Sequence, residues 1–328
     1  MPEICYKEYM KYIRLKTTDP YYNLAVEEYL LRSSDDDIFM LWQNSPTVVI
    51  GKNQNAYAEV NLEYAKEKSI NVVRRITGGG AVYHDLGNLN YTFITSTEKA
   101  RALDYEYFTK PVIDALATFG ISAVLSGRND LEVDGKKFSG NAQFTANGRI
   151  LHHGTLLFNT DLEEMSAVLR VDKEKLEFKS VKSHKGRVTN LAPLLPTTAH
   201  VEDFISAIEN QVVKDLDAKR DEIPENDEIN ELTKRNRSRE WIYSDKRYLT
   251  SYSLYKRKKY PFGIVCTDIK LNGEVIENIT ISGDFFGTRP IEELESLIAG
   301  HHKSDILALN IFPYIDKMTP EEFYELIK

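Results

Sequence analysis

Three consecutive glycines follow a pair of arginines in the segment Arg74-Arg75-Ile76-Thr77-Gly78-Gly79-Gly80-Ala81-Val82-Tyr83-His84-Asp85. Glycine has no Cβ atom, so this backbone can adopt positive φ and lie flat against a ligand. Its N–H groups can then line an anion-binding hollow, beside guanidinium groups that take phosphate oxygens. The segment predicts a nucleotide-handling site, with a tight turn between strands as the alternative. Its spacing matches neither a Gly-x-Gly-x-x-Gly motif nor a P-loop.

A second group of charged residues lies in Gly127-Arg128-Asn129-Asp130 and in Lys136-Lys137-Phe138-Ser139-Gly140-Asn141. Asp134-Gly135 predicts a hairpin turn before the two lysines, which then point to opposite faces of one strand. We expect a solvated surface position for Lys136. Lys137 could instead face a cleft and offset the repulsion between a carboxylate and a phosphate. Asp130 would either hold Mg²⁺ or orient this lysine.

His152 and His153 are adjacent in a predicted strand. Their side chains should diverge, so they do not readily bind one metal ion together. Zinc is not expected, because no cluster of cysteine and histidine lies nearby. A hydrogen-bonding role at the edge of a ligand is the interpretation we favour for one of them. Trp42 stands at the end of another predicted strand, where it either packs in the core or lines an apolar tunnel.

Hydrophobic periodicity and turn residues predict the elements that position these side chains. Helices are expected over residues 23–31, 62–68, 105–119, 201–216, 291–299 and 320–327. Strands are expected over 38–42, 47–50, 71–75, 82–83, 89–94, 131–133, 136–144, 149–159, 252–260, 262–269 and 275–281. The basic segment 179–187 predicts a loop, and 219–240 either a helix or a linker. Helices on both sides of a largely antiparallel sheet make this an α+β protein.

The bulk properties are those of a soluble globular protein, with 328 residues, 42% hydrophobic and 28% charged. This length predicts two domains, 1–247 and a smaller one at 248–328. Neither a membrane span nor a secretory signal is apparent, so we expect a cytoplasmic protein. The net charge of −8 argues against a protein devoted to nucleic acid. Cys5 and Cys266 offer neither a disulfide framework nor a zinc site, and both are expected to be inert.

The glycine-rich segment, continued through Leu86-Gly87-Asn88, resembles the signature of the lipoate–protein ligase A family. The resemblance continues in order through Leu41-Trp42-Gln43-Asn44, Val48-Val49-Ile50-Gly51, Gly127 to Leu131, Lys137 to Ala142, His152 to Leu157 and Arg187 to Leu191. Trp241-Ile242-Tyr243 is a weaker match, and it precedes a segment of about the length of the family's accessory domain.

This resemblance implies a catalytic domain with the fold of biotin ligases and class II aminoacyl-tRNA synthetases, plus a small α/β C-terminal accessory domain. The implied activity uses ATP and Mg²⁺ to convert lipoate into lipoyl-AMP, with release of pyrophosphate. The lipoyl group then passes to a lysine of a lipoyl domain. The implied acceptors are the E2 subunits of 2-oxoacid dehydrogenases and the glycine cleavage H protein, in a pathway of lipoate salvage.

The resemblance also implies roles for individual residues. Lys137 would be the catalytic lysine that bridges the carboxylate and the α-phosphate. The site for ATP and lipoyl-AMP would comprise Arg75, Gly78, Gly79, Gly80, Ala81, Val82, Tyr83, Asp130 and Lys137. The lipoate pocket would comprise Trp42, Arg74, His84 and His153, and the loop that closes on the adenylate would carry Lys182, Lys185 and Arg187. No residue is indicated as the base for the acceptor lysine.

Three other functions are compatible with parts of this pattern. Octanoyl- and lipoyl-transferases of the same fold use a cysteine nucleophile without ATP, but Cys5 and Cys266 lie far from Lys137 in the sequence. A non-catalytic binding protein would not need Lys137 and Arg75. A biotin ligase would share the adenylate site and differ in the acyl pocket, where the motifs of Trp42 and His153 favour lipoate.

Overall fold

The computed structural model describes residues 9–170, 188–195, 200–223, 225–248, 252 and 254–328. The chain forms two compact units that interleave along the sequence. The first contains Met1–Thr47, His84–Glu164 and Val171–Lys234, and the second contains Val48–Tyr83, Met165–Arg170 and Arg235–Lys328. The domain boundary predicted after residue 247 stays a prediction.

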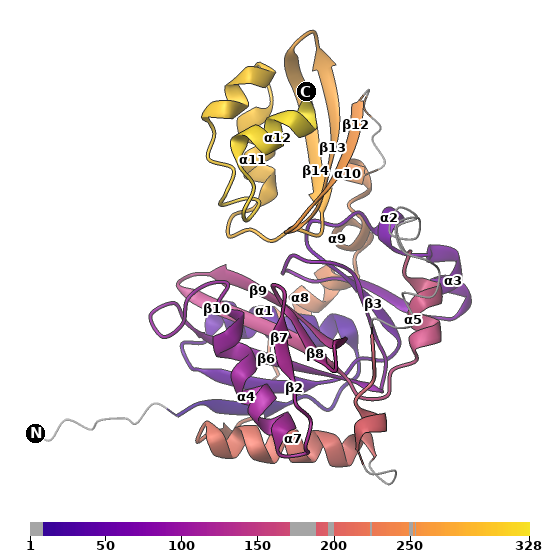
Figure 1. Ribbon diagram of the computed structural model, residues 1–328, viewed down its shortest axis with the longest axis vertical. Coiled ribbons are helices and arrows are strands. Elements are labelled where there is room, and N and C mark those ends of the chain that lie inside the picture. The colour runs from indigo at the N-terminus through magenta and orange to yellow at the C-terminus, as the bar shows by residue number, and fades with distance from the viewer. Residues whose placement is uncertain (1–8, 171–187, 196–199, 224, 249–251, 253) are drawn as a thin grey trace, which may run out of the picture. The chain divides into compact units, whose positions relative to one another are not determined.

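An eight-stranded sheet forms the centre of the first unit, in the order β11-β1-β2-β6-β10-β9-β8-β7 (Figure 1). Its strands are β1 (Lys11–Arg14), β2 (Ile38–Trp42), β6 (Asn88–Ser96), β7 (Val124–Ser126), β8 (Asp130–Val133), β9 (Lys136–Ala146), β10 (Arg149–Leu157) and β11 (Lys219–Arg220). The neighbours β11, β1 and β2 are parallel, and all other neighbouring pairs are antiparallel. The predicted α+β fold with a largely antiparallel sheet is therefore confirmed.

Two tight turns fix the meander of β8, β9 and β10. Asp134 and Gly135 have φ values of 50° and 71°, and Asn147 and Gly148 have values of 51° and 73°. Positive φ at both central residues is the geometry of a type I′ hairpin, which matches the twist of the flanking strands. Both predicted hairpins are confirmed, and the first one sets the register of Lys137.

Helices cover both faces of this sheet. α4 (Tyr105–Ala117) and α7 (Val201–Asp215) share one hydrophobic core with the side of the sheet that carries Phe93. α1 (Pro20–Ser33) lies against the opposite side, where its Glu27 accepts a hydrogen bond from Thr92. Successive strand residues such as Thr92 and Phe93 point to opposite faces, so the two sides of the sheet have distinct chemistry. The first unit also contains the 3-10 helix η2 (Ala192–Leu194), and α5 (Leu162–Val168) and α8 (Asp227–Arg237) each begin in the first unit and end in the second.

The second unit holds two three-stranded sheets. One has the order β4-β3-β5, from β4 (Asn71–Arg74), β3 (Thr47–Ile50) and β5 (Val82–His84). The other runs β12-β13-β14, from β12 (Leu254–Tyr260), β13 (Gly263–Asn272) and β14 (Val275–Gly283). The helices are α2 (Ala56–Glu59), α3 (Leu62–Glu67), α9 (Arg239–Tyr243), α10 (Asp245–Tyr248), α11 (Ile291–Ile298), η3 (Lys303–Ala308) and α12 (Pro320–Ile327). A separate apolar core joins α11 and α12 to the second of these sheets.

No helix in the described part of the chain combines the length and the apolar character that crossing a bilayer requires.

Candidate active site

Lys137 lies on β9, two residues after the first hairpin turn. Its Nζ atom is 2.7 Å from a carboxylate oxygen of Asp130, and both side chains are partly exposed. The ammonium group lies over Gly140, where a Cβ atom would come within 3.2 Å of Nζ. This contact is the one expected if Asp130 orients the lysine, and the role of Asp130 stays a prediction. The neighbouring Lys136 is exposed, as predicted.

Trp42 is buried at the end of β2 and makes a polar contact there. Its Nε1 donates to Thr92 Oγ1 at 2.9 Å, and its ring meets the His84 ring edge-on at a centroid distance of 6.1 Å. His84 is buried as well, with Nδ1 3.1 Å from Nδ2 of Asn44. The first unit thus brings together two of the residues predicted for the lipoate pocket, although they are 42 positions apart in the sequence.

His153 is held by a buried carboxylate. Its Nδ1 lies 3.0 Å and 3.2 Å from the two carboxylate oxygens of Glu27. Oε1 of Glu27 also accepts a hydrogen bond of 2.5 Å from Thr92 Oγ1, which in turn accepts from Trp42. Since Glu27 is only 2% exposed, these donors offset the cost of burying its charge. A continuous chain of polar contacts therefore connects Trp42 to His153.

The adjacent His152 points to the other face of the sheet, as predicted. It stacks on Phe108 at a centroid distance of 4.8 Å, and its Nδ1 lies 3.0 Å from Nε2 of Gln143. Burial lowers the pKa of His152 well below its usual value, so this ring is neutral. The two histidines do not converge on one ion.

The strand register places Trp42, His153 and the amine of Lys137 on one face of the sheet. His153 is directly opposite Thr92, and residues opposite each other in an antiparallel pair share a face. In the next row, Trp42 is opposite Asn90, and Asn90 is opposite Thr155. Thr155 Oγ1 accepts the N–H of Gly140, the residue that lies beneath the Lys137 amine. The α1-facing side of the sheet therefore carries these three predicted site residues.

The triple glycine lies in the second unit and packs against its own chain. A Cβ atom at Gly78 would lie 2.6 Å from the carbonyl oxygen of Phe285, and Gly79 has a φ of 90°. Gly80 has open space where its Cβ would be, with the nearest atom 3.9 Å away on Asp284. The expected freedom of the backbone is confirmed at Gly79, which has a positive φ. At position 78 a glycine is required for a different reason, because the backbone of Phe285 leaves no space for a Cβ atom. Ala81 then leads into β5, of which Val82 and Tyr83 are the first two residues.

The two arginines before the glycines are buried and bind backbone carbonyls. Arg75 Nη2 donates to the carbonyls of Gly78 and Gly80, at 2.7 Å and 2.8 Å. Arg74 donates to the carbonyls of Gly51, Lys52, Gln54, Trp241 and Ile242. Burial lowers the pKa of Arg74 from its usual value. In this structure Arg75 fixes the conformation of the glycine loop through its hydrogen bonds to that loop. Arg74 connects the backbone of residues 51–54 to that of residues 241–242 within the second unit.

Several predicted residues lie outside the described part of the chain, namely Lys182, Lys185 and Arg187 of the expected adenylate loop, and Cys5. Among the residues that the structure does describe, no group of three or more histidine, cysteine, aspartate or glutamate side chains could hold a metal ion. The chain's described side chains thus form no dedicated Mg²⁺ cage.

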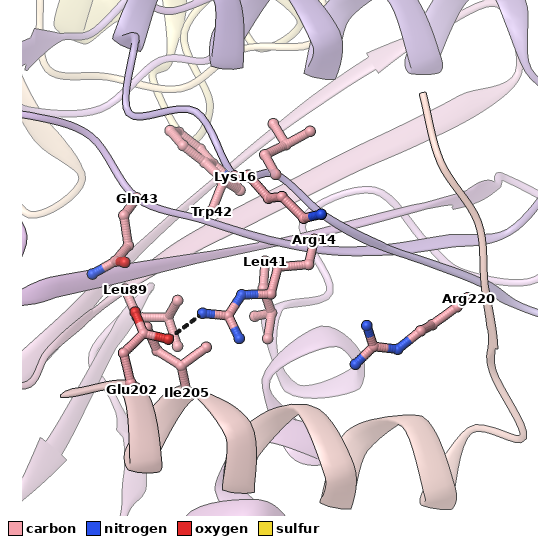
Figure 2. A pocket seen from close by; sticks show the side chains of 10 residues that line it. Arg14, Lys16, Leu41, Trp42, Gln43, Leu89, Glu202, Ile205 and Arg220 are labelled. Atoms are coloured by element: carbon pink, nitrogen blue, oxygen red, sulfur yellow. Dashed lines mark hydrogen bonds and ion pairs between the residues drawn. The ribbon is translucent and has the colours of Figure 1, made fainter. Parts of the chain in front are cut away.

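A pocket of about 420 Å³ opens beside α7 and the ends of β1 and β2 (Figure 2). Its charged lining comprises Arg14, Lys16, Arg220 and Glu202, and its apolar lining includes Leu41 and Leu89. Arg14 pairs with Glu202 at 2.6 Å, and Arg14 and Arg220 both bind the buried Glu209. These carboxylates already neutralise the guanidinium groups, so the pocket is a poor anion site. Of the predicted residues it contains Trp42 alone.

Two family matches together cover most of the chain. Residues 19–213 match the family described as "Lipoyl protein ligase A/B catalytic domain", and residues 250–327 match "Bacterial lipoate protein ligase C-terminus". The chain is 38% identical over 325 residues to "Lipoate-protein ligase LplJ" of Bacillus subtilis (strain 168). This match covers 94% of this chain and 97% of the relative.

Solved structures with similar folds include LipL1 of P. falciparum in complex with lipoate. It has a TM-score of 0.80 and 24% identity, and the match covers 97% of this chain and 98% of that one. This similarity concerns the fold alone. A lipoate-protein ligase A bound with ATP has a TM-score of 0.60 and 27% identity, over 72% of this chain and 98% of that one.

Proposed function

Because the chain belongs to the lipoate–protein ligase family, we propose that it is an ATP-dependent ligase that attaches lipoate to a lysine of lipoyl domains. In the first step, a carboxylate oxygen of lipoate attacks the α-phosphorus of ATP and pyrophosphate leaves. In the second, the ε-amine of the acceptor lysine attacks the acyl carbon of lipoyl-AMP and AMP leaves. The product is an amide.

The observation that carries this proposal is the position of Lys137. Joining a carboxylate to a triphosphate requires two anions to approach each other. A fixed ammonium group offsets this repulsion and needs no reorganisation at the moment of reaction. Asp130 holds Lys137 at 2.7 Å, and Gly140 leaves the space that the ammonium group occupies. Lys137 is therefore the residue to which we assign electrostatic stabilisation of the α-phosphate and the carboxylate.

The nucleotide contacts are assigned to the glycine loop of the second unit. Gly79 donates its N–H to the carbonyl of Phe285, so the backbone N–H of the uncrowded Gly80 is the one that we assign to phosphate oxygens. Arg75 supports this role by holding the carbonyls of Gly78 and Gly80. Ala81, Val82 and Tyr83 would continue the same site. The predicted loop with Lys182, Lys185 and Arg187 would close on the adenylate.

The acyl chain is assigned to the side of the first-unit sheet that faces α1. Trp42, His84 and His153 are buried or nearly so, and each is fixed by a polar contact. Such a wall suits an apolar chain, because the rings that form it are held in place by contacts within the protein. Arg74 would contribute to the lipoate pocket only indirectly, since backbone carbonyls of the second unit surround its guanidinium group.

The partners follow from the same assignment. The acceptors would be lipoyl domains of 2-oxoacid dehydrogenase E2 subunits and the glycine cleavage H protein, and the cell would use the enzyme for lipoate salvage in the cytoplasm. Mg²⁺ would enter with ATP, bound mainly by phosphate oxygens, as is usual for this ion.

An assay of pyrophosphate release with lipoate, octanoate and biotin tests the substrate class. We expect release with lipoate and little or none with biotin. Lys137→Met should reduce adenylation by at least ~10²-fold, the usual effect of removing one stabilising group from a transition state. Lys136→Met provides the matched control, because this neighbouring lysine is exposed and should be dispensable. Release with biotin alone would overturn the substrate, and near-normal turnover of Lys137→Met would overturn the role of the lysine.

A further inference from the structure

A carboxylate lies beside the backbone that we assign to the phosphates of ATP. Gly80 offers that backbone N–H, and the side chain of Asp284 lies next to it in the second unit. The Oδ2 atom of Asp284 is 4.0 Å from the position where Gly80 lacks a Cβ atom. A triphosphate bound at Gly80 would therefore come close to a second anion, and two anions at such short range repel each other.

Backbone contacts fix the position of Asp284. Its Oδ1 atom accepts the N–H of Ile264 at 2.5 Å, and its own N–H donates to the carbonyl of Ile264 at 3.2 Å. Gly263 makes room for the carboxylate, because a Cβ atom there would lie 2.8 Å from Oδ1. The N–H of Gly283 donates to the carbonyl of Asn53 at 2.9 Å. The segment that carries Asp284 is thus tied to two other parts of the second unit.

The two residues after Asp284 contact the glycine loop directly. The carbonyl of Phe285 accepts the N–H of Gly79 at 3.4 Å. The ring of Phe286 lies 2.9 Å from the position of a Cβ atom on Gly79. These contacts, and no flexible surface side chain, determine that the carboxylate lies beside the loop.

One oxygen of Asp284 is open to a ligand. Oδ1 is bound to Ile264, whereas Oδ2 makes neither a hydrogen bond nor an ion pair with the residues that the structure describes. Arg75, the buried cation of the loop, donates to the carbonyls of Gly78 and Gly80. The side chain of Asp284 is partly exposed, so the carboxylate is neither neutralised by a cation nor closed off by packing.

A divalent cation would convert this repulsion into attraction. Mg²⁺ is usually held by one or two carboxylates together with the phosphate oxygens of the nucleotide, and seldom by a cage of protein ligands. A carboxylate with one fixed oxygen and one open oxygen fits this mode of binding. It also agrees with the finding that no group of three or more potential ligands gathers among the described side chains.

We propose that Asp284 is a ligand of the Mg²⁺ ion that enters with ATP, through its Oδ2 atom. The carboxylate and the phosphate oxygens would share this ion near Gly80. Asp284 lies within residues 250–327, which match the C-terminal family, so this part of the chain takes part in nucleotide binding. The inference rests on the proposed ligase function and assigns one protein ligand to its metal.

Calorimetry of ATP binding without lipoate gives a test whose sign depends on the metal. Asp284→Asn keeps an oxygen for the N–H of Ile264 and replaces the open oxygen with an amide nitrogen. With excess Mg²⁺, the variant should bind ATP at least ~10-fold more weakly than the wild type, as is usual for a lost contact at a metal site. With EDTA, it should bind ATP about 2- to 5-fold more tightly, because one partly exposed like charge is gone.

Asp268→Asn is the matched control in the same unit. Asp268 is a partly exposed residue of β13, and one of its oxygens likewise accepts a backbone N–H, from Tyr252 at 3.1 Å. The control loses the same charge and keeps the carboxylate beside Gly80. Its affinity for ATP should therefore stay close to that of the wild type, both with Mg²⁺ and with EDTA.

The two reaction steps give a second readout in the full-length protein. The β- and γ-phosphates are present only during adenylation, so Asp284→Asn should slow the release of pyrophosphate with lipoate. Transfer from chemically prepared lipoyl-AMP to a purified lipoyl domain should stay within a few-fold of the wild type. A general loss of structure would slow both steps.

Two results would overturn the assignment. One is an unchanged dependence of ATP affinity on Mg²⁺ in Asp284→Asn. The other is tighter ATP binding by this variant with Mg²⁺ as well as with EDTA, which would identify the carboxylate as a purely repulsive group.

The wild type provides the answer if Asp284→Asn does not fold. Binding of ATP with Mn²⁺ in place of Mg²⁺ should broaden the amide resonance of Ile264, whose N–H donates to the same carboxylate. A sharp Ile264 resonance in that complex would exclude the site. Failure of the wild type to bind ATP, with or without metal, would refute the proposed ligase function itself.

Discussion

The thiol of Cys266 bears on the difference between a ligase and the cysteine-dependent transferases. It lies on β13 of the second unit, and burial raises its pKa above the usual value. A raised pKa keeps the thiol protonated at neutral pH, and a protonated thiol is a poor nucleophile. We expect slow alkylation of Cys266 by iodoacetamide at pH 7 and faster alkylation only as the pH rises toward the raised pKa.

The corresponding variant is Cys266→Ser. It should retain lipoate-dependent pyrophosphate release and transfer, because no covalent acyl-cysteine lies on the proposed route. Loss of transfer in Cys266→Ser, with a normal melting temperature, would favour a thioester mechanism.

The residues of the site differ in how far the sequence could reveal them. Lys137, Trp42 and His153 belong to short motifs with chemically informative neighbours, so they could be predicted. Glu27 and Thr92 could not, because Glu27 is 126 residues from His153 and 65 from Thr92, and only the packing of α1 against the sheet brings Glu27 to these two strand residues. Their type gives no signal either, since a glutamate in an amphipathic helix usually lies in solvent. The buried position of Arg74 was equally hidden, because its partners are backbone carbonyls from two other segments, residues 51–54 and 241–242.

At the scale of elements, local chemistry made the hairpins predictable. Asp134-Gly135 and Asn147-Gly148 specify type I′ turns without help from distant residues. The strands β1 and β11 were not predicted, because they are short and each forms by parallel pairing with a distant segment. Glu209 of α7 binds both Arg14 and Arg220 and so fixes the helix beside these two strands. Such pairings depend on the tertiary fold, and the hydrophobic pattern does not contain them.

The glycine loop is an element in which structure and function can be separated. Alanine at Gly78 would meet the carbonyl of Phe285 at 2.6 Å, and alanine at Gly79 would be strained by a φ of 90°. Gly78→Ala and Gly79→Ala should therefore each destabilise the second unit by at least about 1 kcal/mol. Gly80→Ala has open space and should keep the wild-type melting temperature, while a methyl group on the phosphate-facing backbone should weaken ATP binding.

Calorimetry of ATP binding and thermal unfolding of the three variants would check this prediction. Wild-type ATP affinity in a stable Gly80→Ala would exclude close approach of phosphate to this residue. Wild-type stability of Gly78→Ala would exclude the tight contact with Phe285.

At the scale of the whole molecule, each unit has its own apolar core, and the second core joins α11 and α12 to β12, β13 and β14. The predicted domains 1–247 and 248–328 stay a prediction that rests on composition and length. Composition and length could not show that residues 48–83 belong with the C-terminal half, because that association depends on long-range contacts such as those of the glycine loop.

A partly buried ion pair gives a test of the second unit's own stability. Arg247 binds both carboxylate oxygens of Glu295, at 2.6 Å and 2.7 Å, and the same carboxylate accepts the N–H of Ile281. Removing one partner of a fully buried pair leaves an uncompensated charge, which costs about 3–5 kcal/mol, and this partly exposed pair should cost less than that but more than a surface pair. We expect Glu295→Ala to lower the unfolding temperature of the second unit in differential scanning calorimetry by a large margin.

Glu293→Ala, in the same helix, breaks only the exposed pair with Arg289 and should cost no more than about 1 kcal/mol. Because the glycine loop belongs to the same unit, Glu295→Ala should also weaken ATP binding at elevated temperature. Equal stability of the two variants would show that the Arg247–Glu295 pair does not hold this unit together.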